Sequence, residues 1–248
     1  MKRLFLILSL YSFYLATAFA VTKAAADSAY AHENYQRAAQ LYEQVLKQGV
    51  SADLYYNLGN AYYRMDNITQ AVLNYERALV LSPGDDDIRF NLQMARSKTI
   101  DKITPESEMF FVTWYRSLVS LMGVDGWAWL ALVALGVAII LALAYLFSNR
   151  IWLRKLGFFG GIFFVLLFLL SNVFAWQKKL ALIHRPGAIV VRSAVTVKST
   201  PSKNGTDLFI LHEGTKVVIT DGSMRGWKEI RVADGKEGWV EASEIEVI

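Results

Sequence analysis

Hydrophobic and polar positions follow different spacings in successive parts of the chain. Residues 21–103 carry apolar positions about every 3.6 residues, as amphipathic helices do, whereas residues 127–147 and 156–176 are almost continuously apolar. From residue 185 to 248 the apolar positions alternate at period two, which is typical of strands. The pattern predicts a multidomain membrane protein that combines an all-α helical repeat array, a two-helix transmembrane hairpin and an all-β barrel.

The N-terminus has the features of a secretory signal. Lys2 and Arg3 precede an apolar run, and Ala18 and Ala20 form the small-residue pattern that signal peptidases cleave. Residues 1–20 are therefore predicted to be a signal peptide that directs the following chain out of the cytoplasm. The alternative is an uncleaved anchor, because the stretch is barely long enough to span a membrane.

The stretches 127–147 and 156–176 are each 21 residues long, enough to cross a hydrocarbon core of roughly 30 Å as helices. The connecting residues 148–155 contain Arg150, Arg154 and Lys155, and this excess of positive charge predicts a cytoplasmic loop. Lys178 and Lys179 run against this rule, because the signal peptide places their end of the hairpin outside. The signal peptide decides the orientation, with both flanking regions exported.

Other features concern how the hairpin packs and how it is anchored. Residues 109–123 place apolar side chains on one helical face, which predicts an amphipathic helix in the membrane interface. Tryptophans near the ends of the two stretches are typical of interfacial anchors: Trp127, Trp129, Trp152 and Trp176. Gly157 and Gly161 permit close helix packing, either against the first span or against another protein.

The array region contains a repeated pattern. One copy has aromatic and small residues at fixed spacing: Tyr55, Leu58, Gly59, Tyr62, Ala71, Tyr75, Ala78 and Pro83. This copy resembles a tetratricopeptide repeat, and Ala38, 33 residues before Ala71, begins the same second-helix pattern in a degenerate upstream copy. Residues 87–98 supply only a first helix, which is expected to be a solvated cap. The region 21–103 is thus predicted to hold about two and a half repeats.

Such arrays bind extended peptides or helices in a groove lined by their first helices. The polar candidates for this groove are Asn57, Asn60, Arg64, Arg89 and Arg96. Some of them resemble the asparagine and basic groups with which certain tetratricopeptide domains hold a C-terminal carboxylate, although the full set is not matched. The alternative interpretation is an ordinary solvated helix face.

The region 185–248 is expected to form a small closed barrel of five or six strands. Its Gly-Trp pairs at 226–227 and 238–239, with turns at 213–214 and 234–235, resemble the bacterial SH3-like domain. That resemblance implies recognition of cell-wall peptides or protein segments. Trp239 is expected in the barrel core, whereas Trp227 is either a core residue or a residue that stacks on a ligand.

Composition narrows the chemistry. The chain has no cysteine and three histidines far apart in sequence, and no nucleophile, base or metal-ligand cluster is apparent, so we expect no enzymatic activity, metal or cofactor. The net charge of +4 comes mainly from basic residues that flank the apolar stretches. It therefore reflects membrane topology, and nucleic acid is not an expected partner.

The order of these parts resembles the tetratricopeptide-repeat membrane proteins of the Bat (Bacteroides aerotolerance) operon. The resemblance lies in the architecture of nearly the whole chain and includes the Gly-Trp-Ala-Trp-Leu sequence at 126–130. It implies a scaffold in the inner membrane whose partners are membrane proteins with von Willebrand factor A domains, together with an AAA-type ATPase, in an aerotolerance or envelope-stress complex. The alternative is a sensor or anchor that binds peptidoglycan through the SH3-like domain.

Overall fold

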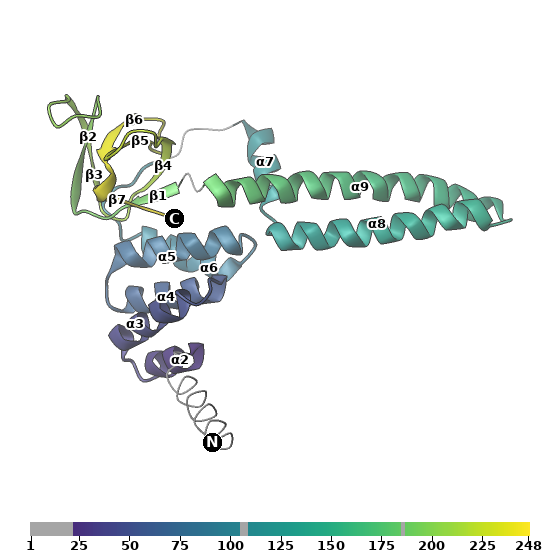
Figure 1. Cartoon of the computed structure of the whole chain (residues 1–248), viewed down its shortest axis with the longest axis horizontal. Coiled ribbons are helices and arrows are strands. Elements are labelled where there is room, and N and C mark those ends of the chain that lie inside the picture. Colours follow the sequence, from purple (N-terminus) through teal and green to yellow (C-terminus); the bar gives the residue numbers. More distant parts are fainter. Residues whose placement is uncertain (1–21, 105–108, 185–186) are drawn as a thin grey trace, which may run out of the picture.

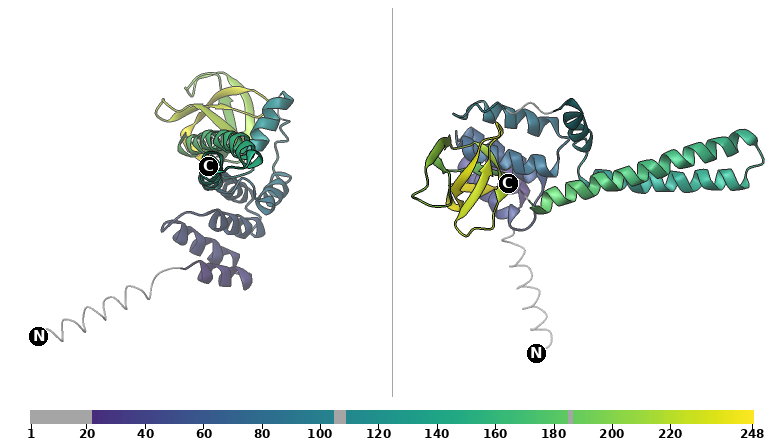
Figure 2. Two further views of the ribbon diagram at one scale, coloured as in Figure 1. Left: turned by 90° about the vertical axis from the view of Figure 1, so that its right-hand side faces the viewer. Right: turned by 90° about the horizontal axis from the view of Figure 1, so that it is seen from above.

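The computed structural model describes residues 22–104, 109–184 and 187–248. The predicted signal peptide at 1–20 lies outside these residues. A stack of helices and a curled β-sheet form one body, and a long helical hairpin projects from it (Figure 1). The helices of the array stack across the direction of the hairpin rather than along it (Figures 1 and 2).

Five helices make up the array: α2 (Lys23–Ala31), α3 (Tyr35–Leu46), α4 (Ala52–Arg64), α5 (Ile68–Leu81) and α6 (Asp86–Arg96). Each begins after a polar residue whose side chain accepts a hydrogen bond from a backbone N–H of the first turn: Thr22, Asn34, Ser51, Asn67 and Asp85. Two helix pairs followed by a single first helix are the predicted two and a half repeats.

Gly59 determines how closely α4 and α5 approach. A Cβ atom at Gly59 would lie 2.7 Å from the ring of Tyr75, a distance that no real Cβ contact shows. Any side chain at position 59 would therefore push α4 away from α5, which explains why the repeat pattern has glycine there.

The hairpin consists of α8 (Val124–Phe147) and α9 (Ile151–His184), preceded by α7 (Phe110–Val119). By length and composition, Val124–Phe147 and Ile151–Leu180 could each cross a membrane, with mean hydropathies of 2.8 and 2.3. Both are longer than predicted, and the loop is shorter: α9 begins at Ile151, so residues 151–155 are helical and only 148–150 connect the two helices. Arg154 and Lys155 therefore lie in the first turns of α9, whereas Arg150 lies in the connection.

The small residues of α9 pack against α8. A Cβ atom at Gly157 would lie 2.6 Å from the carbonyl oxygen of Leu141 and 2.8 Å from the amide nitrogen of Tyr145. Of the two interpretations left open by the sequence, packing within the hairpin is therefore the one observed for Gly157.

The prediction that Trp127 is an interfacial anchor is wrong. It is buried, its indole N–H donates to the Val119 carbonyl at 3.0 Å, and its ring packs edge-on against Phe174 at 4.9 Å between centroids. Tyr115 also packs against Phe174 and donates to Gln177 at 2.8 Å. These contacts attach α7 to both helices of the hairpin, whereas Trp129, Trp152 and Trp176 are exposed.

Seven antiparallel strands form the sheet, in the order β3-β2-β6-β5-β4-β1-β7. Their bounds are β1 (Gly187–Val190), β2 (Ala194–Lys198), β3 (Asp207–His212), β4 (Lys216–Asp221), β5 (Trp227–Arg231), β6 (Glu237–Glu241) and β7 (Ile245–Val247). The sheet curls around an apolar core that includes Val195, Val197, Ile230 and Val240. The predicted all-β part is observed, but two details of the prediction are wrong: β7 adds a strand to the expected five or six, and the sheet is curled without being closed, because β3 and β7 are edge strands. We call this curled sheet, residues 187–248, the barrel below.

The barrel and the array share a hydrophobic core through β1. Ala188 and Val190 face the core of the barrel, as alternation along a strand requires. Ile189, between them, is fully buried on the opposite face and packs into the core of the array with Ala71 and Val72 of α5. Ile248 joins the same cluster, so the end of the chain also contributes to the contact.

Charged groups surround this apolar contact. Glu76 of α5 is 1% exposed and forms ion pairs with Arg96 of α6 and with Lys216 of β4, the latter at 2.7 Å. Arg77 pairs with Glu246 at 3.0 Å and donates to the Val247 carbonyl at 2.7 Å. The buried Glu76 carboxylate thus pairs with one cation of the array and one of the barrel, and docking of the barrel supplies the second of these.

The segment after α6 forms a second connection. Asp101 accepts hydrogen bonds from the His212 amide at 2.7 Å and from the Thr215 hydroxyl at 2.6 Å, and its other oxygen lies 2.7 Å from His212 Nδ1. Burial by itself would raise the pKa of Asp101, but these hydrogen bonds outweigh it and hold the pKa below its usual value. His212 is therefore a residue of the contact between the barrel and the array.

Candidate partner-binding surfaces

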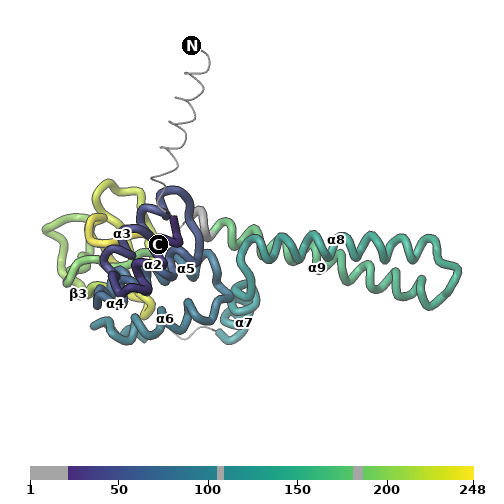
Figure 3. Tube along the Cα trace, turned by 90° about the horizontal axis from the view of Figure 1, so that it is seen from below, coloured from purple at the N-terminus to yellow at the C-terminus, as the bar shows by residue number. Residues whose placement is uncertain are grey.

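The barrel packs on α5, a second helix of the repeats, whereas the first helices α4 and α2 stack on the side of α5 away from the barrel (Figures 1 and 3). The first helix α6 lies beside α5, and its buried Leu92 and Ala95 belong to the core that the barrel shares. The first helices carry aromatic residues at equivalent positions: Tyr30 and Tyr63 are 33 residues apart, and Tyr56 and Phe90 are 34 apart. Spacing of three, four and seven residues places 56, 60 and 63 on one face of α4. We call the set Tyr30, Tyr56, Tyr63, Arg64 and Phe90 the first-helix surface.

Aromatic and cationic side chains meet on this surface. Tyr30 packs edge-on against Tyr35 at 5.2 Å, and the Arg64 guanidinium lies 4.7 Å from the centre of the Tyr35 ring. The tyrosines are half-buried, and Phe90 is 63% exposed. Rings with polar edges and an exposed phenyl group suit contact with a peptide that offers both apolar side chains and backbone carbonyls.

Two of the predicted groove residues, Asn57 and Asn60, bind within the array. Asn57 donates to Asp27 of α2 at 3.4 Å, and Asp27 also accepts from Tyr42 at 2.6 Å. One repeat later, the Asn91 amide donates to Asn60 at 2.9 Å.

Asn60 in turn accepts from Tyr75 at 2.7 Å, so the same three-residue hydrogen-bonded unit occurs twice. Its members are 33, 33 and 34 residues apart: Tyr42 and Tyr75, Asp27 and Asn60, Asn57 and Asn91. The unit joins each first helix to the next, so the amides of Asn57 and Asn60 have a structural role.

The three predicted arginines occupy different environments. Arg64 is exposed and belongs to the first-helix surface. Arg89 binds the α5–α6 turn, donating to the Pro83 carbonyl at 2.8 Å and pairing with Asp86. Arg96 pairs with buried Glu76, so the expectation of a merely solvated cap is wrong for this residue. The structure therefore does not bring the five predicted residues together as one site.

The barrel offers a second surface on β5 and β6. Gly238 and Val240 are buried, and a Cβ atom at Gly238 would lie 2.5 Å from Val197. Trp239, between them, lies on the outer face and is half-buried, so its predicted place in the core is wrong. In the β5–β6 register Trp227 pairs with Glu241 and Glu229 with Trp239, which places both tryptophans diagonally on the same outer face.

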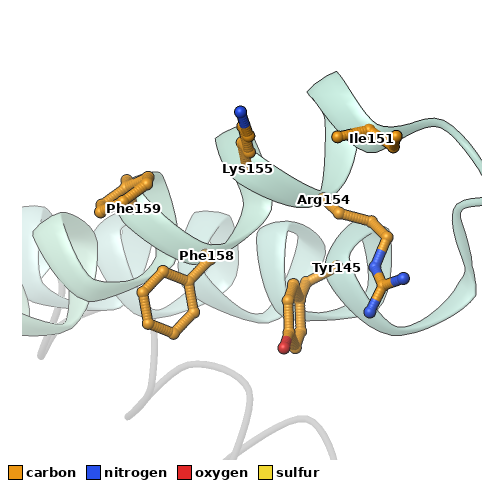
Figure 4. Close-up of a pocket in the computed structure, with 6 residues that line it drawn as sticks. All are labelled: Tyr145, Ile151, Arg154, Lys155, Phe158 and Phe159. Atoms are coloured by element: carbon orange, nitrogen blue, oxygen red, sulfur yellow. The ribbon is translucent and has the colours of Figure 1, made fainter.

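A cavity of about 320 Å³ lies at the far end of the hairpin, near the α8–α9 connection (Figure 4). It is lined by Tyr145, Arg154 and Phe158 among others, and the Arg154 guanidinium lies 5.5 Å from the centre of the Tyr145 ring. This pairing keeps the charge of Arg154 beside an aromatic face at the end of the apolar helices. The cavity is separate from both surfaces described above.

Comparison with protein families supports both modules. Residues 23–86 match the tetratricopeptide repeat family, and residues 193–246 match the bacterial SH3 domain family. The first match covers α2 to α5 and the second covers β2 to β7. No curated protein matches the chain. The domain composition is thus established for these two parts, and it indicates protein–protein interaction for the repeats and cell-wall binding for the SH3 domain.

Proposed function

We propose that the protein is a non-enzymatic scaffold of a bacterial inner membrane, anchored by α8 and α9, with its repeats and SH3 domain on the periplasmic side. The observation that carries the proposal is that the SH3 domain covers α5 and leaves the first-helix surface, with exposed Phe90 and Arg64, to a partner. The contact between the two modules is rigid, and the hairpin anchors them in the membrane. Together, these two features would hold the first-helix surface at a fixed place above the bilayer. Tethering raises the effective concentration for other membrane proteins, so a modest affinity suffices.

The proposed partners are those implied by the resemblance to the Bat-operon membrane proteins. A Bat-type complex would supply membrane proteins with von Willebrand factor A domains, together with an AAA-type ATPase, in aerotolerance or envelope stress. An extended segment of such a partner would lie across α2, α4 and α6, with apolar side chains against Phe90 and Tyr56 and a carboxylate near Arg64.

Co-purification after crosslinking in intact cells tests this proposal. The wild type is compared with an Arg64→Ala, Phe90→Ser double variant, which removes two exposed side chains of the first-helix surface. The matched control is Arg37→Ala with Val50→Ser, because these residues are also exposed but lie on α3 and in the α3–α4 connection. We expect recovery of specific membrane proteins to fall about tenfold in the first variant and to stay unchanged in the second. Equal recovery from all three proteins would contradict the proposal.

The alternative function is peptidoglycan binding by the SH3 domain, and the diagonal pair Trp227 and Trp239 favours it. Outward aromatic rings on adjacent strands can stack on sugar or peptide groups. The test is sedimentation of the detergent-solubilised full chain with purified cell wall. A wall-binding protein pellets and loses this property in a Trp227→Ala, Trp239→Ala variant, whereas a protein scaffold remains in the supernatant.

A further inference from the structure

The array meets the membrane hairpin through two turns that touch backbone to backbone. A Cβ atom at Gly84, in the α5–α6 turn, would lie 2.7 Å from the carbonyl oxygen of Leu121, in the α7–α8 turn. A Cβ atom at Gly123 would lie 3.3 Å from the carbonyl oxygen of Leu81. The two glycines therefore let the turns approach, and this contact fixes the array at the end of the hairpin.

A cleft of about 790 Å³ lies beside this contact, bounded by the two turns and by the last part of α9. Its charged lining consists of Asp85 and Asp125 together with Lys178 and Lys179. Phe174, one helical turn before Lys178, packs against Trp127 near the start of α8. The cleft is therefore level with the ends of the two candidate spans, where lipid headgroups lie if the hairpin crosses a bilayer.

The two lysines have no partner of their own within residues 22–104, 109–184 and 187–248, where neither forms an ion pair or a hydrogen bond. They also contradict the charge rule for membrane topology, because the proposed orientation places them outside the cytoplasm. Adjacent unpaired cations at the level of the headgroups are explained if they bind a phosphate.

The carboxylates decide which kind of headgroup fits. Two lysines alone would favour an anionic lipid, but Asp85 and Asp125 balance their charge and would repel a second negative group. One oxygen of Asp85 already accepts the N–H groups of the first turn of α6, which leaves its other oxygen for a donor. Asp125 is exposed at the start of α8. A ligand with one phosphate and one ammonium group complements this lining.

We propose that the cleft binds the headgroup of a zwitterionic phospholipid with a primary amine, phosphatidylethanolamine. The phosphodiester lies against Lys178 and Lys179, and the ammonium group donates to Asp85 or Asp125. The acyl chains pass down the apolar surface of the hairpin. The bound lipid would fill the space between the array and the hairpin. It would thereby restrict movement of the array, which carries the first-helix surface that the proposed function requires. This inference rests on the proposed insertion of α8 and α9 into a membrane.

Native mass spectrometry of the full chain, purified from membranes in mild detergent, tests the site. We expect the wild type to retain one phosphatidylethanolamine, and a Lys178→Gln, Lys179→Gln variant to retain it at least fivefold less. The matched control, Arg150→Gln with Lys155→Gln, removes two positive charges from the other end of the hairpin and should retain the lipid as the wild type does. Equal loss in both variants, or equal retention in both, would overturn the proposal.

Titration of the delipidated protein identifies the ligand. Phosphatidylethanolamine should bind at least fivefold more tightly than phosphatidylglycerol, and inorganic phosphate should not bind. An Asp125→Asn variant, which keeps both lysines, should lose this preference. Equal or tighter binding of phosphatidylglycerol, or an adduct of phosphate alone, would overturn the assignment.

Alkaline carbonate extraction separates this proposal from the proposed function. A wild-type protein that stays in the membrane but carries no phosphatidylethanolamine refutes the lipid site alone. If alkaline carbonate extracts the wild-type protein from the membrane, both the membrane anchor and the lipid site that depends on it are refuted.

Discussion

Replacing Ile189 with alanine tests whether the two modules form a rigid contact or are only loosely tethered to one another. Ile189 lies on a barrel strand but its side chain is fully buried in the core of the array. The substitution removes the equivalent of about three methylene groups, worth roughly 0.8 kcal/mol each, and leaves a cavity as well. We therefore expect the free energy of separating barrel from array to fall by about 2–4 kcal/mol, which raises the separated population roughly 30-fold to 1,000-fold.

Hydrogen exchange measures this change on the full chain in detergent. The His212 amide donates across the contact to Asp101, so the peptide around residues 208–216 reports separation of the two parts. Its protection should fall in Ile189→Ala, while the core strands of the barrel keep theirs, because Ile189 does not contribute to the barrel core.

The control is Val218→Ala, since Val218 lies on the neighbouring strand β4 with its side chain 43% exposed. Surface substitutions of this kind change stability by about 0.5 kcal/mol or less. If Ile189→Ala changed the protection of residues 208–216 no more than Val218→Ala does, the shared core would not hold the modules together and the reasoning would be refuted.

Other substitutions test the remaining contacts. Gly84→Val should displace the array from the hairpin and increase proteolysis of the α7–α8 turn, whereas Gly49→Val should not, because a Cβ atom at Gly49 meets nothing within 4 Å. The pKa of Asp101 is lowered in the folded protein, so its contribution is complete above the unfolded pKa of about 3.9 and is lost as the pH falls through the folded pKa. Protection of the His212 amide should therefore decrease below about pH 4, and Asp101→Asn should show lower protection already at pH 7 and no such further step. Asn91→Ala breaks one hydrogen-bonded unit of the array and should cost about 1 kcal/mol in thermal unfolding; a cost near zero would show that the unit does not stabilise the stack.

The sequence predicted the order of the parts well because each part has its own spacing of apolar residues. Gly59 and Tyr75 identify the repeat because a helix pair can approach closely only with a small residue at that point. Alternation likewise identified most strands of the SH3 domain. Strand β7 was missed because it has only three residues and follows a short 3-10 turn at 242–244.

The sequence did not predict the contact between the modules, because it joins residues more than 100 positions apart. One signal was present: residues 188–191 are apolar at every position, which indicates a strand buried on both faces. Glu76 gave no such signal, since its burial depends on cations from two other elements. The prediction for Trp127 is wrong because a tryptophan near the end of an apolar stretch can either lie in the membrane interface or pack between helices, and the sequence does not distinguish the two.

The candidate site was predicted only in part for a related reason. Their polarity and their place on first helices predict groove residues, but Asn57 and Asn60 bind neighbouring helices of the array. The aromatic members, Tyr56 and Phe90, recur with the same period as the repeat and could have been found from that periodicity. Recurrence of an aromatic residue alone does not distinguish a core position from an exposed one.

Site-specific photocrosslinking in living cells tests the central claim most directly. A photoreactive phenylalanine analogue is placed at Phe90 in one strain, at Val50 in a second and at Trp227 in a third. The account predicts a discrete crosslink to a membrane protein from position 90 and none from position 50. No protein crosslink from position 90, together with capture of cell-wall fragments from position 227, would contradict the scaffold and favour the wall anchor.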